Sequence, residues 1–185
     1  MGEIMEATLE KTVTERLREA GEFARAYVTT ALWSSTEYPF GVCPCCGREA
    51  LLCKLPEADF DQELMCDAPG CGVREAQPDP MDDNYDEADL SPEALERMLA
   101  DCAHFESEQG EVIREAIETG EVRFGPDFGA LGRAGHDFWL TRNGHGAGFW
   151  DGGWPKPMAD ELTKAAKAFG GCDLYAGDEG KLHLS

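Results

Sequence analysis

Apolar residues recur at spacings of three and four over positions 5–33, which places them on one face of an α-helix. The pattern starts at Leu9 and continues to Ala31. It predicts one long helix with a core-facing stripe, ended by Ser34 and Pro39. Anionic lipid would repel the glutamates on the polar face, so this helix is not expected to lie on a membrane.

A second helical pattern follows residues 77–89, whose many aspartates and prolines predict a linker. Ser91 is a favourable N-cap and Pro92 suits the first helical position, so a helix is expected to begin there. Gly110 is expected to interrupt it. Residues 112–117 then predict one more helical segment.

From Gly120 onward the chain is rich in glycine, aromatic and β-branched residues. The string HDFWLTRNGHGAGFWD contains Asn143-Gly144, a pair typical of a tight hairpin turn, and it therefore predicts a β-hairpin. Residues 158–169 predict a short helix. The string CDLYAGDEGKLHL predicts a second hairpin that turns near residues 178–180.

Four cysteines form two pairs at metal-ligand spacing. The string CPCCG fits a zinc knuckle with Cys43 and Cys46 as ligands, and Cys66 and Cys71 follow after two short strand candidates. Four thiolates in a tetrahedron suit Zn²⁺, and zinc binding would fold a module with little core of its own. The sequence therefore predicts a zinc ribbon that binds one zinc ion per chain.

The other cysteines leave alternatives open. Cys45 could replace either ligand of the first pair or be a free thiol, and an iron–sulfur cluster is a less favoured occupant. Cys53, Cys102 and Cys172 lie in apolar patterns and are expected in the core. Residues 41–77 carry three basic and seven acidic side chains, which favours bracing or protein contact over direct nucleic-acid binding.

These elements predict an α+β protein made of four segments. They are an N-terminal amphipathic helix (1–40), the zinc-ribbon module (41–77), an acidic connector with helices (78–119) and a C-terminal α+β domain (120–185). The last is expected to hold a small antiparallel sheet and one helix.

The net charge of the chain is −21, and its distribution is uneven. Residues 78–119 hold 14 acidic and 2 basic side chains, a net charge of −12. Such a surface repels phosphate and attracts proteins with basic clefts, including proteins that bind nucleic acid. A solvated face that maintains solubility is the alternative. The side chains expected to contact a basic partner are Asp82, Asp83, Asp86, Glu87 and Asp89.

Two histidines lie near the predicted hairpin turn. His136, Asp137 and His145 could form a hydrolytic site, but their spacing matches no catalytic motif. The alternative is structural, with aromatic side chains packing the sheet and glycines permitting sharp turns. No catalytic or cofactor-binding residue is therefore assigned, and a hydrolase stays an alternative function.

Three strings carry a family resemblance: LSPEALERMLADCAHF, AGHDFWLTRNGHGAGFWDGGWP and LTKAAKAFGGCDLYAGDEGKL. Over roughly residues 90–185 the chain resembles a group of small uncharacterised proteins of bacteriophages and prophages. The resemblance implies a viral accessory protein that acts in a bacterial host, and it implies no activity. The N-terminal helix and the cysteine module lie outside it.

The expected function is that of a non-catalytic accessory protein. It would bind and inhibit a host nucleic-acid-handling or defence protein, with its acids mimicking a polyanion. A nucleic-acid-associated zinc-ribbon protein is the alternative, and a hydrolase is a weaker one. The chain contains no apolar run of membrane-spanning length and its N-terminus does not resemble a signal peptide, so the cytoplasm of the host is the expected compartment.

Overall fold

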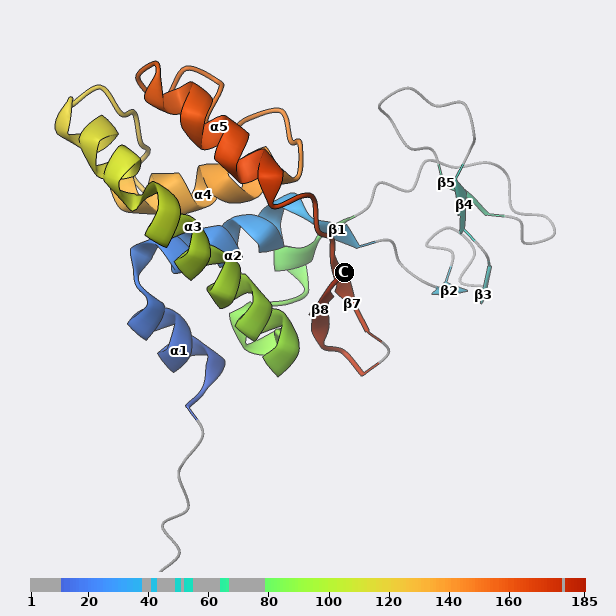
Figure 1. Cartoon of the computed structure of the whole chain (residues 1–185). Helices are drawn as coiled ribbons and strands as arrows, with labels where there is room; N and C mark the ends of the chain where they lie inside the picture. Colours follow the sequence, from blue (N-terminus) through green and yellow to red (C-terminus); the bar gives the residue numbers. More distant parts are fainter. Residues whose placement is uncertain are drawn as a thin grey trace, which may run out of the picture.

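The computed structural model describes residues 11–37, 79–177 and 179–185, together with four short strands between residues 41 and 66. Five α-helices lie in the described residues, so the chain is a mixed protein with more helix than strand (Figure 1). They are α1 (Val13–Ala20), α2 (Glu22–Ser34), α3 (Pro92–Glu118), α4 (Ala130–Arg142) and α5 (Met158–Ala168). Two short 3-10 helices precede α3: η1 (Met81–Asp83) and η2 (Glu87–Asp89).

The described strands pair antiparallel, two by two. The pairs are β1 (Thr36–Glu37) with β6 (Asp79–Pro80), β2 (Gly41–Val42) with β3 (Glu49–Ala50), β4 (Leu52–Lys54) with β5 (Leu64–Cys66), and β7 (Leu174–Ala176) with β8 (Leu182–Leu184). The last pair confirms the predicted C-terminal hairpin. Leu182 also forms a parallel bridge with Leu90, and its carbonyl accepts the Ser91 N–H at 2.9 Å, so the hairpin is anchored at the start of α3.

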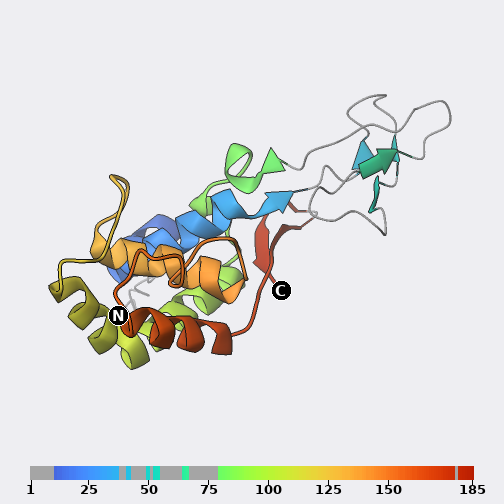
Figure 2. The ribbon, with the colours of Figure 1, turned by 90° about the horizontal axis from the view of Figure 1, so that it is seen from above.

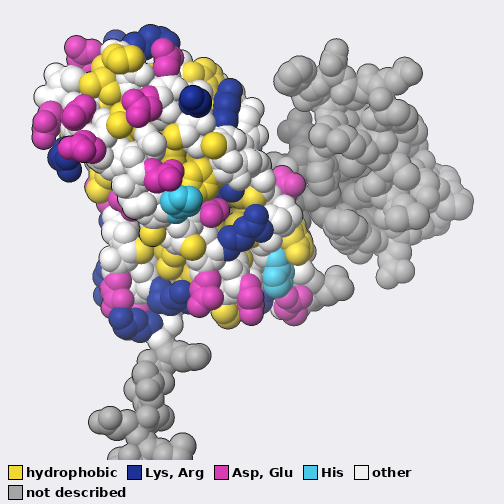
Figure 3. Space-filling view, in the orientation of Figure 1, with side chains coloured by type: hydrophobic (Ala, Val, Ile, Leu, Met, Phe, Trp, Pro, Cys, Tyr) yellow, Lys and Arg dark blue, Asp and Glu magenta, His cyan; other side chains and the backbone are white. Residues whose placement is uncertain are grey.

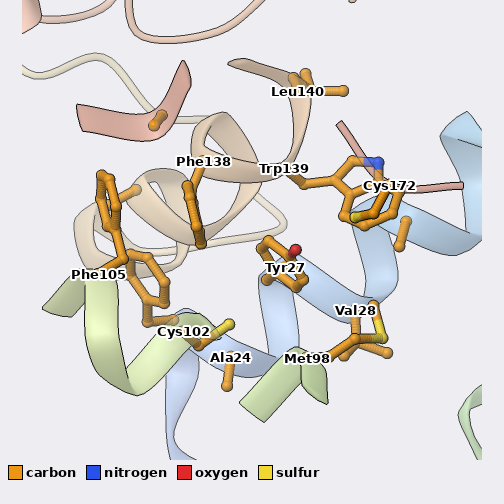
Figure 4. Packing of buried hydrophobic residues seen from close by; sticks show 14 of the residues in the cluster. Ala24, Tyr27, Val28, Met98, Cys102, Phe105, Phe138, Trp139, Leu140 and Cys172 are labelled. Carbon is orange, nitrogen blue, oxygen red and sulfur yellow. The ribbon is translucent and has the colours of Figure 1, made fainter. Parts of the chain in front are cut away.

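The core lies where α2, α3 and α4 meet, with α5 against α3 and α4 (Figure 2). Tyr27 of α2, Phe105 of α3 and Phe138 of α4 point toward one another and are fully buried (Figure 4). The ring centroids of Phe105 and Phe138 are 4.1 Å apart. Burying such a side chain contributes about 1.5–3 kcal/mol. Buried residues of the three segments 1–40, 78–119 and 120–185 thus belong to one hydrophobic cluster.

Helices α2 and α4 approach each other closely at one glycine. A Cβ atom built on Gly135 of α4 would lie 2.0 Å from the backbone carbonyl oxygen of Phe23 in α2. Real Cβ atoms never sit so close to a backbone oxygen, so only glycine fits at this crossing. The absence of a side chain at Gly135 therefore sets the distance between the two helices.

The prediction of one unbroken helix over residues 5–33 is wrong for the residues described. Gly21 separates α1 from α2 with a φ of 94°, a conformation that side-chain-bearing residues rarely adopt. A capping box of Thr12 and Glu15 begins α1. The apolar spacing continues across the break because Leu17 and Phe23 both face the core, so the spacing alone did not reveal it.

The predicted start of α3 is confirmed, whereas the predicted interruption at Gly110 is wrong. The Ser91 side chain accepts a hydrogen bond from the Ala94 N–H at 3.1 Å, and Pro92 is the first helical residue. The helix then continues through Gly110 to Glu118. Glycine inside a helix costs about 1 kcal/mol, and burial of Phe105 and Ile113 on either side outweighs this cost.

The hairpin predicted around Asn143-Gly144 is also wrong, because this string forms α4 and the loop that follows it. Its buried side chains include Ala134, Phe138 and Thr141, which recur at helical spacing. Asn143 is the C-cap of α4, and Gly144 follows with a φ of 72°. The Asn-Gly pair therefore ends a helix here, because a glycine at positive φ commonly follows the last helical residues. The helix predicted over 158–169 is confirmed as α5.

Two of the cysteines expected in the core are confirmed there. Cys102 on α3 is 1% exposed and Cys172 is 4% exposed, and burial raises the pKa of both thiols. Among the described residues, no helix combines the length and apolar character needed to cross a membrane.

Candidate functional site

The predicted zinc ligands lie outside the part of the chain whose side chains are described. Cys43, Cys46 and Cys71 fall outside the described residues, and Cys66 ends β5 with no description of its side chain. Cys45 also falls outside the described residues, and Cys53 lies in β4 with no description of its side chain. Within the described residues, His, Cys, Asp and Glu side chains do not form any group of three or more that could hold a metal ion. The zinc site therefore stays a prediction.

The acidic segment, residues 79–90, is not the linker that the sequence predicts. It begins with β6 and continues through η1 and η2, with η1 packed against α2 and η2 against α1 and α2 (Figure 2). Met81 and Leu90 are each 2% exposed and belong to the hydrophobic core. The Met81 N–H donates to the Ser35 carbonyl at 3.0 Å, which attaches the segment to the end of α2. Two buried apolar side chains thus fold a stretch whose composition is typical of a linker.

The five acids of this segment differ in exposure and in partners. Asp82, Asp83 and Asp86 are exposed, whereas Glu87 and Asp89 are half-buried. Asp86 and Asp89 cap η2, each accepting a backbone N–H, at 2.7 and 3.0 Å respectively. A lysine lies 3.9 Å from the Asp89 carboxylate, so that acid is partly neutralised. Within this segment, the three exposed aspartates are therefore the acids best placed to act on a partner in solvent.

A buried carboxylate, Asp137, is at the centre of a second polar cluster. Its side chain has no exposed surface. Arg133 Nε and Trp154 Nε1 donate to Asp137 Oδ2 at 2.6 and 2.7 Å, and His136 Nδ1 lies 2.7 Å from Asp137 Oδ1. Such donors compensate for removing the charge from water. The cluster fastens the loop that contains Trp154 to α4.

The same cluster shows what the predicted hydrolytic residues can do. The structure places His136 and Asp137 in contact, as an Asp–His catalytic pair requires. The ring of His136 stacks on Trp33 with 5.9 Å between centroids. Among the described residues, the hydrogen-bond partner of His136 is Asp137, and its ring also lies near Phe128. Asp137 also accepts hydrogen bonds from Arg133 and Trp154, so the same carboxylate joins α4 to the loop that contains Trp154.

His145, the third residue of that hypothesis, lines a different feature. Its imidazole borders a hollow of about 310 Å³ between the C-terminal ends of α2 and α4 and the segment before β7. Partial burial lowers the pKa of His145, which favours the neutral ring. His136 is not among the residues that line this hollow. The two histidines are therefore not brought to one site.

Arg142 joins α4 to α2, α3 and the segment after α5, a role that is not apparent from the sequence. Its guanidinium is buried beside α2 and α3, where Nη1 donates to Tyr27 Oη and to Asp101 Oδ2 at 2.7 Å each. Its Nε donates to the Gly170 carbonyl at 2.9 Å. These partners lie 28 to 115 positions away in the sequence, so no local pattern could reveal them.

Three comparisons with known proteins complete this description. No family model matches the chain, and neither the curated proteins nor the solved structures yield a significant match.

Proposed function

We propose that this chain is a non-catalytic, bacteriophage-type accessory protein that presents the acidic segment to a basic cleft of a host protein and inhibits it. The observation that carries the proposal is the exposure of Asp82 and Asp83 on η1 and of Asp86 at the N-cap of η2, within a chain of net charge −21. The resemblance of residues 90–185 to phage and prophage proteins supports the host setting.

The folded state of the segment favours binding. A disordered acidic tail loses conformational freedom when it docks, which reduces affinity. Here Met81 and Leu90 are already buried and η2 is already capped, so much of that ordering occurs when the protein folds. Charges within about 8 Å, the Debye length at physiological salt, act together on an approaching partner. Asp82, Asp83 and Asp86 lie within five positions of one another in the sequence, so they are expected to act together in this way.

The expected partner is a protein whose cleft normally holds nucleic acid. Lys and Arg side chains that neutralise phosphates would meet carboxylates instead. On the face that Figure 3 shows, acidic and basic side chains both occur, and some of them pair. Arg16 lies 3.7 Å from Glu96, and Arg114 lies 3.2 Å from Glu111, for example. The charges within each of these pairs partly cancel at a distance, whereas no ion pair to a described residue is seen for Asp82, Asp83 or Asp86.

Neutralising the exposed aspartates is expected to slow association with the partner. The triple variant Asp82→Asn, Asp83→Asn, Asp86→Asn should associate about tenfold more slowly at low salt and show a flatter dependence on salt. Asparagine also caps helices, so η2 should persist. The protein would be immobilised, partners captured from host lysate at low and high salt, and association rates then measured with the captured protein.

A matched variant distinguishes the effect of these three aspartates on association from the effect of the net charge of the chain. Glu115, Glu118 and Glu121 are exposed, and replacing them by Gln changes the net charge by the same three units. This control should associate as fast as the wild type, and duplex DNA should displace the wild type from the partner. Equal rates for both triple variants, without competition by DNA, would show that the acids serve solubility alone.

We also propose that residues 41–77 bind one zinc ion through Cys43, Cys46, Cys66 and Cys71, and that this module braces the fold or contacts the partner. Two antiparallel pairs support the layout, because β2 and β3 flank the first cysteine pair in sequence and β5 ends at Cys66. Four thiolates are a donor set that Zn²⁺ prefers, and its binding free energy would stabilise a module with few apolar residues.

Zinc content tests this part of the proposal. The wild type should retain about one zinc ion per chain after dialysis against a weak chelator, measured by elemental analysis. Cys43→Ser or Cys71→Ser should lose the ion, whereas Cys102→Ala, which alters a buried residue of α3, should keep it. Full zinc content in the double variant Cys66→Ser, Cys71→Ser would contradict the ligand assignment.

A further inference from the structure

The hollow beside His145 combines polar and apolar walls. Ser34, Ser35 and Thr36 line it from the end of α2, and Asn143 and His145 line it from the end of α4. Asp173, just before β7, and the apolar side chains of Trp139 and Leu174 also border it. Its volume of about 310 Å³ can hold a small organic group.

Hydrogen bonds hold the walls of the hollow in place. The Trp139 indole N–H donates to Ser34 Oγ at 2.8 Å, which joins α4 to the end of α2. Asn143 Nδ2 donates to the Trp139 carbonyl at 3.1 Å, and Asn143 Oδ1 accepts the Cys172 N–H at 2.8 Å. The hollow is therefore formed before any ligand arrives, which lowers the cost of binding.

The electrostatics of the hollow favour a cation. The C-terminal ends of α2 and α4 both border it, and a helix C-terminus carries a partial negative charge. Asp173 is exposed and adds a full carboxylate charge, with no ion pair to any described residue. None of the described lining residues is Lys or Arg. The guanidinium of Arg142, at the end of α4, is already bound to Tyr27 and Asp101.

We propose that this hollow binds an alkylammonium group, as carried by a lysine side chain or by a free alkylamine. The ammonium would lie between Asp173 and His145, where the carboxylate and a ring nitrogen accept its N–H groups. The alkyl stem would extend along the wall of the hollow toward Trp139 and Leu174, of which only a small edge is exposed. The proposal concerns a different surface from the acidic segment and does not depend on it.

The residue types distinguish this ligand from a metal ion or an anion. His145, Cys172 and Asp173 all line the hollow, but within the described part of the chain they do not form a group of three that could hold a metal ion. An anion would be repelled by Asp173 and by both helix ends. A neutral His145 does not repel a cation, and burial lowers its pKa, which favours that form. A charged head on an apolar stem matches both kinds of wall.

Titration with n-butylammonium chloride at constant ionic strength, followed by NMR, tests the proposal. We expect saturable shifts of the His145 imidazole, the Asn143 side-chain amide and the Trp139 indole N–H, with no saturable shift from 1-butanol. A second arm uses an acetylated and amidated Gly-Lys-Gly peptide. Tighter binding of the peptide than of butylammonium identifies a protein lysine as the natural ligand, and the reverse order identifies a free amine.

Two aspartate variants provide the decisive comparison. Asp173→Asn should weaken butylammonium binding about threefold, as expected for the loss of one exposed ion pair. Asp160→Asn removes an exposed carboxylate of α5 that does not line the hollow, and it should bind butylammonium like the wild type. Unchanged affinity in Asp173→Asn, or shifts with butylammonium that do not saturate at His145, would overturn the proposal.

Discussion

Replacing Gly135 with alanine is expected to destabilise the protein by about 3 kcal/mol or more, the upper range for overpacking a core. The added methyl group would lie 2.0 Å from the Phe23 carbonyl oxygen and 2.8 Å from its carbonyl carbon. Both atoms belong to the backbone of α2, so no side chain can rotate away. The helices must separate, and the core between Tyr27 and Phe138 must then open. Urea unfolding followed by far-UV circular dichroism would measure the loss.

Gly110→Ala is the matched control for this variant. Gly110 also lies within a helix, but a Cβ atom there would meet nothing within 4 Å. Alanine has the higher helix propensity by about 1 kcal/mol, so this variant should be slightly more stable than the wild type. If both substitutions changed the free energy of unfolding alike, the close crossing of α2 and α4 would not be the cause.

Asp137→Ala is expected to cost about 3–5 kcal/mol, the loss typical of removing one partner from a buried ion pair. The variant leaves the Arg133 guanidinium, 21% exposed, without its 2.6 Å acceptor, and it leaves the Trp154 indole N–H buried and unpaired. The loop around Trp154 should also detach from α4. The same urea titration measures the stability, and proteolysis between residues 143 and 157 should report the detachment.

Two further variants test the origin of that loss. Asp137→Asn keeps one oxygen that can accept from Arg133 and Trp154, so it should cost less, about 1–3 kcal/mol. Asp160→Asn breaks an exposed ion pair with Lys156 and should change the stability by less than about 1 kcal/mol. A loss for Asp137→Ala no larger than that of Asp160→Asn would mean that the buried cluster does not hold the loop.

The candidate sites could be anticipated only where their signal is local. Asp82, Asp83 and Asp86 stand out as an acidic run, and their exposure follows from their charge. Their attachment to the core could not be anticipated, because Met81 packs on residues of a different part of the chain. His136 and Asp137 are adjacent in sequence, so their contact is local. The hollow beside His145 joins residues 34–36, 139–145 and 172–174, and no sequence pattern connects these three segments.

Features that depend only on neighbouring residues can be predicted from the sequence alone. Ser91 and Pro92 begin α3 through a local cap, α5 follows its own apolar spacing, and the C-terminal hairpin turns within a few residues. The physical reason is that capping, propensity and short turns involve groups only a few positions apart, so one segment contains all the information.

Where a local sequence preference conflicts with burial against distant segments, the tertiary contacts determine the structure. The Asn143-Gly144 pair suits a hairpin, yet burial of Phe138 and Trp139 against α2 makes its string a helix, and the pair becomes the helix end. Gly110 stays helical because α3 packs along its length, whereas Gly21, at positive φ, breaks the predicted first helix in two. Each outcome depends on burial against distant segments, worth several kcal/mol, which exceeds propensities of about 1 kcal/mol.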